Sequence, residues 1–76
     1  MTFEKVRGII AEQIGIAEDT ITLETSLADD IGADSLDIFQ IVSNLEEEFG
    51  IEFAPDSVEG MRTVADAVGY IDANVK

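Results

Sequence analysis

Apolar residues recur at helical spacing in three long segments of the chain. In the first segment, residues 2–14, they lie three or four positions apart, at Phe3, Val6, Ile10 and Ile14. Because an α-helix turns once in about 3.6 residues, this spacing places them on one face and predicts an amphipathic helix. We expect Thr2 to cap the start of this helix and Gly15 to end it.

A second amphipathic helix is expected to follow Asp34 and to run to Phe49, with Gly50 ending it. Asp34 can cap the first turn, and the carboxylate of Asp37 suits the positive end of the helix dipole. The core-facing positions are Ile38, Ile41, Val42, Leu45 and Phe49. Leu36 falls almost opposite this stripe and Phe39 at its edge, so we expect both at the surface.

The C-terminal third predicts one short helix and one long helix. Pro55 opens a segment through Glu59 that fits one or two helical turns before Gly60. Thr63 and Asp66 then stand three residues apart, as in a capping box. The apolar positions that follow at helical spacing, and that we assign to the core, are Val64, Ala67, Val68, Ile71 and Val75.

Residues 16–33 lack sustained helical spacing and are interrupted by Thr, Ser, Asp and Gly, which indicates a long loop. Ile21 and Leu23 alternate with threonines as in a strand, but a lone short strand has no partner. We therefore expect both side chains to pack over the core. The predicted fold is all-α, a small bundle of three long helices and one short helix forming one domain, residues 1–76.

Composition excludes most catalytic chemistry. The 76 residues include 17 acidic and 4 basic side chains, no histidine and no cysteine, for a formal net charge of −13. The commonest general base, a thiolate nucleophile and a disulfide are therefore absent, and the serines have no histidine to activate them. The negative charge repels nucleic acid and favours basic partners.

Membrane and calcium-binding roles are also disfavoured by the sequence. No apolar run reaches the roughly 20 residues that span a bilayer, and Met1 leads into a mixed polar segment, so we expect a cytoplasmic monomer that does not bind membranes. A calcium loop starting at Asp30 would place Ser35 where glycine is needed and Ile41 where glutamate is needed, and a start at Asp29 is worse. We expect no metal site, although weak binding of divalent ions by clustered carboxylates stays open.

The most informative stretch is residues 32–37, Gly-Ala-Asp-Ser-Leu-Asp, in which a turn delivers Ser35 to the first turn of a helix. Ordinary capping accounts for most isolated Asp-Ser pairs, so the surroundings decide the interpretation. A phosphate on Ser35 would meet free backbone N–H groups and the positive end of the helix dipole. Leu36, exposed beside it, has no evident structural purpose.

This stretch and three others at matching spacing resemble the acyl carrier protein family over essentially the whole chain. The others are Leu45–Phe49 (Leu-Glu-Glu-Glu-Phe), Ile9-Ile10 with Glu12-Gln13, and Thr63-Val64 with Tyr70-Ile71. The resemblance implies that Ser35, flanked by Asp34 and Leu36, receives 4′-phosphopantetheine from coenzyme A through a carrier-protein synthase, which is a phosphopantetheinyl transferase. The thiol of that arm would carry acyl groups as thioesters, so the protein would be a carrier and not an enzyme.

The partner-binding surface is expected on the exposed side of the second helix. Its candidate residues are Leu36, Asp37, Phe39, Gln40, Ser43 and Glu47. Carboxylates around a small apolar patch should steer basic-surfaced acyl-processing enzymes more than bind them tightly. Relatives commonly have Val, Glu and Met where this chain has Phe39, Gln40 and Ser43, so partner contacts are expected to differ.

Three functions follow from these observations. The first is an acyl carrier of fatty-acid biosynthesis whose helical core shelters part of the acyl chain. The second is a carrier of a polyketide or other specialised acyl pathway, which the residues at positions 39, 40 and 43 keep open. The third, from another class, is an acidic interaction or ion-buffering protein without a prosthetic group.

Overall fold

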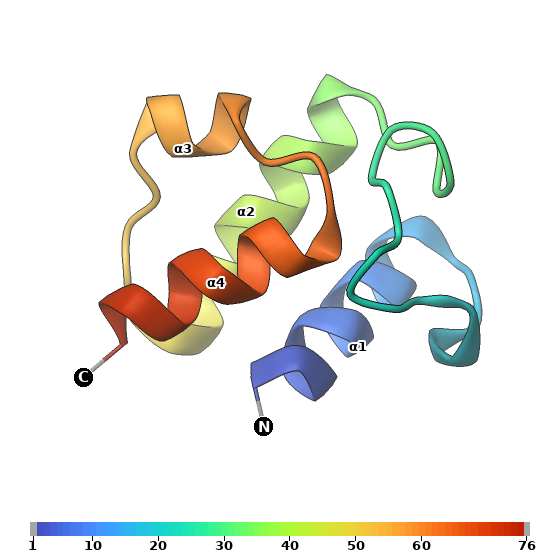
Figure 1. Ribbon diagram of the computed structural model, residues 1–76, viewed down its shortest axis with the longest axis horizontal. Helices are drawn as coiled ribbons and strands as arrows, with labels where there is room; N and C mark the ends of the chain where they lie inside the picture. Colours follow the sequence, from blue (N-terminus) through green and yellow to red (C-terminus); the bar gives the residue numbers. More distant parts are fainter. Residues whose placement is uncertain (1, 76) are drawn as a thin grey trace.

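The computed structural model describes residues 2–75, and within this range it is helical without any strand. Its elements are α1 (Thr2–Ile14), the short 3-10 turn η1 (Glu18–Thr20), α2 (Ser35–Phe49), α3 (Pro55–Glu59) and α4 (Val64–Asn74). Figure 1 shows α1, α2 and α4 as the body of the bundle, with the short α3 linking α2 to α4 on one side. The predicted all-α fold of three long helices and one short helix is confirmed.

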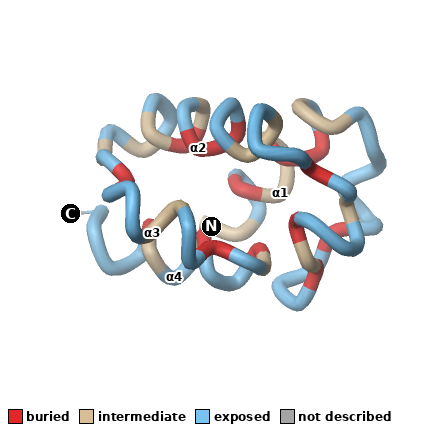
Figure 2. The backbone as a smooth tube through the Cα atoms, turned by 90° about the horizontal axis from the view of Figure 1, so that it is seen from above, coloured by how far each residue is buried: buried red, intermediate tan, exposed pale blue. Residues whose placement is uncertain are grey.

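The hydrophobic core lies where α1, α2 and α4 meet. Each helix contributes side chains with almost no exposed surface: Val6 and Ile10 from α1, Ile41 and Leu45 from α2, Val64 and Ile71 from α4. In Figure 2 the buried part of α2 faces the other helices and the exposed part faces outward. Burying one such side chain contributes about 1.5–3 kcal/mol, so these residues hold the three helices together.

Most of the residues that we expected to begin or end a helix do so. Asp34 and Asp37 form a capping box at α2, and Thr63 and Asp66 form another at α4. Gly15 follows α1 with φ of 84°, a left-handed conformation that favours glycine. Thr2, which we expected to cap α1, is instead the first residue of the helix. Its hydroxyl donates a hydrogen bond to Asp72 Oδ1 at 2.6 Å, which ties the start of α1 to α4.

The long loop is held against the start of α4 by backbone hydrogen bonds. The Leu27 N–H donates to the Arg62 carbonyl at 2.9 Å, and the Val64 N–H donates to the Thr25 carbonyl at 3.0 Å. Ala65 N–H adds a bond of 2.9 Å to the Leu23 carbonyl. The loop is therefore fixed along its second half, although it contains only the 3-10 turn as regular structure.

Two side chains that we expected in the core are exposed. Ile21 is buried, but Leu23 is 45% exposed, and the hydrogen bond that joins Leu23 to α4 is made by its carbonyl. Val75 is 42% exposed. It lies after the end of α4 in an extended conformation, where the helical spacing that placed it on the core face no longer applies.

The cap of α4 carries a perturbed carboxyl group. Asp66 Oδ2 accepts hydrogen bonds from the backbone N–H groups of Arg62 at 2.9 Å and Thr63 at 3.1 Å. These bonds, the Arg62 bond first, lower the pKa of Asp66 below its usual value of 3.8, because they favour the charged form. The ionised carboxylate thus fixes the segment between α3 and α4.

Candidate functional site

Ser35 is presented to solvent by a turn whose geometry the neighbouring residues fix. Gly32 takes φ of 76°, which glycine adopts without strain. Ala33 is buried, and its N–H donates to the Leu27 carbonyl at 2.9 Å, so the chain is anchored two residues before the serine. Asp34 is extended as the cap of α2, and Ser35 is therefore the first helical residue, with an exposed side chain.

The first turn of α2 has backbone N–H groups that are available to bind an anion. Asp34 Oδ1 accepts from the Asp37 N–H at 2.9 Å, and Asp37 Oδ2 accepts from the Asp34 N–H at 3.4 Å. Within residues 2–75, no hydrogen bond engages the Ser35 hydroxyl or the N–H groups of Ser35 and Leu36. An anion on Ser35 would therefore meet unpaired N–H groups at the positive end of the helix dipole.

The outer face of α2 combines exposed apolar side chains with acidic ones. Leu36 is 78% exposed and Phe39 is 62% exposed, and because they are three residues apart in a helix, these two large apolar side chains are neighbours on its surface. We use the name "outer face" for the surface formed by the half-buried Asp37 and by six exposed residues, Asp34, Leu36, Phe39, Gln40, Ser43 and Glu47. The site residues that the sequence suggests thus lie at the start of α2 or farther along its solvent-facing surface.

The three consecutive glutamates at the end of α2 have different environments. Glu47 is exposed on the outer face, and Glu48 lies 3.7 Å from Lys5 Nζ of α1. Glu46 is half-buried, and its Oε2 accepts a hydrogen bond from the Phe53 N–H at 2.8 Å. The role of Glu46 could not be predicted from the sequence, because a run of glutamates predicts that all of its side chains face solvent.

A hollow of about 370 Å³ opens beside the outer face, between α2 and α3. Phe39, Val42 and Ser43 line it from α2, and Phe53 and Val58 line it from the α3 side. We call it the α2–α3 groove. A larger hollow of about 620 Å³ between α1 and α2 is lined by three carboxylates, so it suits water better than an apolar chain. The α2–α3 groove is therefore the better candidate for an apolar ligand.

Carboxylates are abundant, but in the part of the chain that the structure describes they do not gather into a group of three that could hold a metal ion. The outer face of α2 is nonetheless negative, since it carries Asp34, Asp37 and Glu47, and α2 contains no lysine or arginine. The arrangement therefore favours docking of a positively charged protein surface.

Comparison with known proteins identifies the family. Residues 4–71 match the family described as "Phosphopantetheine attachment site". The chain is 49% identical to an acyl carrier protein of Clostridium acetobutylicum over 76 residues, which covers 100% of this chain and 99% of the relative. The chain belongs to the acyl carrier protein family. An acyl carrier protein of Zymomonas mobilis is also 49% identical, over 93% of this chain and 91% of its own length.

Solved structures agree with this assignment. A putative acyl carrier protein from Mycobacterium tuberculosis superposes with a TM-score of 0.90 at 29% identity, covering 96% of this chain and 97% of its own. The acyl carrier protein from Enterococcus faecalis superposes with a TM-score of 0.82 at 37% identity, covering 96% and 92%. The resemblance drawn from the sequence is confirmed.

Membership in the family settles the class of function. The protein is an acyl carrier and not an enzyme, and it bears a covalently attached phosphopantetheine group. A carrier of this family works with the synthase that loads it and with acyl-processing enzymes. The alternative of an acidic protein without a prosthetic group is therefore wrong. Within residues 2–75, no helix is long and apolar enough to cross a bilayer.

Proposed function

We propose that Ser35 is the attachment point of 4′-phosphopantetheine. The observation that carries the proposal is the exposed Ser35 hydroxyl, which starts a capped helix beside two unpaired N–H groups. The other serines offer less. Ser26 Oγ accepts from the Asp29 N–H at 3.1 Å, whereas Ser43 and Ser57 lie inside helices. None of these three has an unoccupied helix start next to an exposed leucine.

The loading chemistry needs a base from outside this chain. Ser35 Oγ would form a bond to the phosphorus of the phosphopantetheine half of coenzyme A, and adenosine 3′,5′-bisphosphate would leave with the electron pair of the broken bond. The hydroxyl proton would pass to the synthase, because this chain has no histidine and no basic residue on α2. Once bound, the group supplies the thiol that holds acyl chains as thioesters. The carrier itself contributes position and exposure.

The pathway that fits best is fatty-acid biosynthesis, with residues 1–76 acting as one monomeric, cytoplasmic carrier domain. The outer face of α2 would dock basic-surfaced acyl-processing enzymes, since exposed carboxylates raise encounter rates more than affinity. A polyketide or other specialised pathway is the second candidate. It stays open because Phe39, Gln40 and Ser43 stand where relatives commonly have Val, Glu and Met. Acylation assays with purified enzymes of each pathway separate the two.

The acyl chain would fold back into the protein through the α2–α3 groove. The groove opens along α2 from Phe39, one helical turn beyond Ser35, and its volume of about 370 Å³ falls within the range of small-ligand pockets. Each buried CH₂ contributes roughly 0.8 kcal/mol, so five or six contribute about 4 kcal/mol before the cost of ordering the chain. Thermal unfolding of the arm-only, two-carbon and eight-carbon forms tests this. An eight-carbon form that melts no higher than the others would contradict sheltering.

A further inference from the structure

The connector from α2 to α3, Glu52 to Ala54, is held by side chains rather than by regular structure. The Phe53 N–H donates to Glu46 Oε2 of α2 at 2.8 Å. On the other side, the Tyr70 hydroxyl of α4 donates to the Glu52 carbonyl at 2.9 Å and accepts from the Ala54 N–H at 3.3 Å. Two side chains from two helices thus satisfy three polar backbone groups of two successive peptide bonds, which would otherwise need water as a partner.

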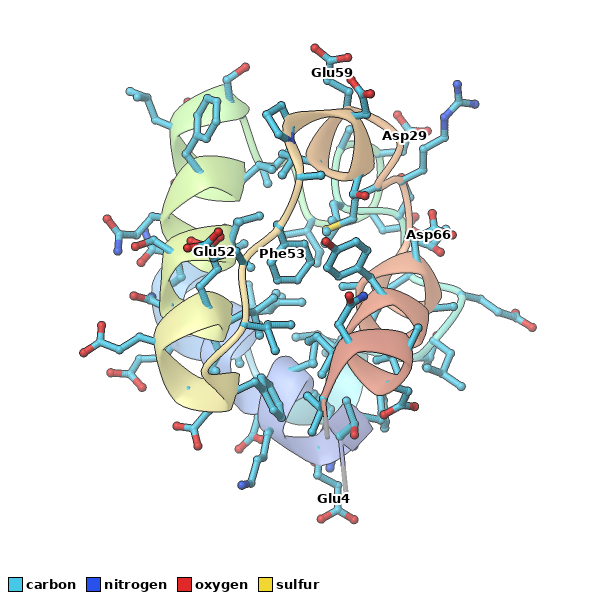
Figure 3. All side chains as sticks on the ribbon, turned by 90° about the vertical axis from the view of Figure 1, so that its left-hand side faces the viewer. Glu4, Asp29, Glu52, Phe53, Glu59 and Asp66 are labelled. Atoms are coloured by element: carbon cyan, nitrogen blue, oxygen red, sulfur yellow. The ribbon has the colours of Figure 1, made fainter. Side chains whose placement is uncertain are left out.

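The connector is also fixed by its own aromatic side chain. Phe53 is 8% exposed, and its ring stacks on Tyr70 with the centroids 4.5 Å apart and the planes inclined by 18°. Figure 3 shows Phe53 in the space between α2 and α4, below the short α3. Stacking of two aromatic rings contributes about 0.5–1.5 kcal/mol beyond the burial of their area. Tyr70 therefore holds the connector through both its ring and its hydroxyl.

The connector in turn decides where α3 lies. No residue of α3 itself is buried, so this five-residue helix depends on its flanks for its position. The Ala54 carbonyl accepts from the N–H groups of Ser57 and Val58 at 3.0 and 3.1 Å, which joins the connector to the first turn of α3. Since α3 forms one wall of the α2–α3 groove, a shift of the connector moves that wall.

We propose that Glu46 and Tyr70 are positioning residues that set the width of the α2–α3 groove and thereby limit the length of acyl chain that this carrier shelters. The proposal rests on the proposed sheltering of the chain. Glu46 and Phe53 themselves line the groove, so a chain that enters it reaches the bonds that hold it closed. Long chains would have to break them, and short chains would not.

Single substitutions can remove these bonds without emptying the core. Tyr70→Phe deletes only the hydroxyl and keeps the stacked ring. Glu46→Ala deletes the acceptor of the Phe53 N–H, and Glu46→Gln restores a neutral acceptor of the same length. Glu47→Ala is the matched control, because it removes the same charge from the neighbouring, exposed position of the same helix.

Amide hydrogen exchange in the unloaded protein tests whether the bonds hold the connector. We expect exchange to rise about tenfold at Ala54 in Tyr70→Phe and at Phe53 in Glu46→Ala, with partial recovery in Glu46→Gln. Glu47→Ala should leave both rates unchanged, and Ile10 in the core of α1 should be unaffected by Tyr70→Phe. Unchanged rates at Phe53 and Ala54 in both variants would overturn the proposal.

Melting temperatures across a series of acyl lengths test the limit on chain length. The quantity compared is the melting temperature of each acyl form minus that of the arm-only form of the same variant, which removes any loss of stability caused by the substitution itself. In the wild type this gain should level off as the chain lengthens. In Tyr70→Phe and Glu46→Ala it should level off at chains longer by about two methylene groups. A merely structural role predicts lower melting temperatures but the same dependence on length.

The two proposals fail in different ways. If Ser35 takes no arm, the assignment of the attachment site is wrong, and exchange in the unloaded protein still decides whether Glu46 and Tyr70 hold the connector. If Ser35 is loaded and no acyl chain raises the melting temperature of the wild type, the carrier function stands and the role of these residues in chain length is wrong. Identical length dependence in wild type and variants would also overturn it.

Discussion

The inner and the outer face of α2 each contain a leucine, but the two leucines have different roles. On the inner face, Leu45 has no exposed surface and belongs to the core to which α1 and α4 also contribute. On the outer face, Leu36 is 78% exposed and does not belong to that core. The inner leucine stabilises the fold, whereas the outer one is free to contact another protein. The residues that stabilise the fold and the residues available for recognition therefore lie on opposite sides of one helix. A substitution on one side can alter one property without altering the other.

The largest effect is expected from a cavity on the inner face. Leu45→Ala should lower the free energy of unfolding by about 2–5 kcal/mol, because the removed methyl groups leave a space that the surrounding helices fill only in part. For a domain of this size, that corresponds to roughly 10 °C or more in melting temperature. Thermal unfolding followed by circular dichroism measures it. At a temperature where the variant is still folded, loading of Ser35 should proceed at the wild-type rate.

Leu36→Ala should show the opposite pattern. Loss of an exposed leucine should change the melting temperature little, yet it should slow loading by the synthase about tenfold, as expected for a residue that anchors an interface. The apparent second-order rate constant for loading measures the effect, and the melting temperature is the control. If Leu36→Ala loads at the wild-type rate, or unfolds as easily as Leu45→Ala, the division between the faces is wrong.

Charge on the outer face should have a smaller and salt-dependent effect. Glu47→Lys should slow loading several-fold at low ionic strength, because it reverses a charge where a basic partner is expected to approach. In 0.5 M salt, where screening lengths fall to a few Å, the difference between variant and wild type should nearly vanish. Insensitivity to both salt and the substitution would show that docking is not electrostatic.

The smallest effect concerns the cap of α4. The pKa of Asp66 is lowered on folding, so its carboxylate stabilises the native state above the usual value of 3.8 and loses that contribution as the pH falls through the lower, folded-state value. Asp66→Asn should therefore be less stable than the wild type at neutral pH, and the gap should narrow below about pH 4. Urea titrations of both proteins across this range measure the gap. A gap independent of pH would mean that the charge of Asp66 is unimportant.

The helices of the bundle could be predicted because their signals are local. Spacing alone predicts that Ile41 and Leu45 are buried and that Leu36 is exposed. The capping box can be predicted because Asp34 and Asp37 are only three residues apart. The same reasoning fails at Val75, because it extends the helical spacing one residue beyond the end of α4. Periodicity shows where apolar residues would lie in a helix but does not show where the helix stops.

The contacts that complete the site could not be predicted, because they join residues far apart in the chain. Nothing in the sequence pairs Tyr70 with Glu52, eighteen residues away, or the Leu27 N–H with the Arg62 carbonyl. Glu46 lies in an acidic run, which predicts that its side chain is exposed, yet it is half-buried. Such contacts depend on how the helices pack, and a single sequence contains no periodic signal for them.

Mapping the adduct on the loaded protein tests the central claim, that Ser35 at the start of α2 carries the arm. Wild type and Ser35→Ala are each incubated with coenzyme A and a phosphopantetheinyl transferase, and peptide mass then locates the modification. We expect one arm on the wild type, confined to the peptide that contains Ser35, and none on Ser35→Ala. An arm on Ser26, Ser43 or Ser57, or loading of Ser35→Ala, would contradict the account.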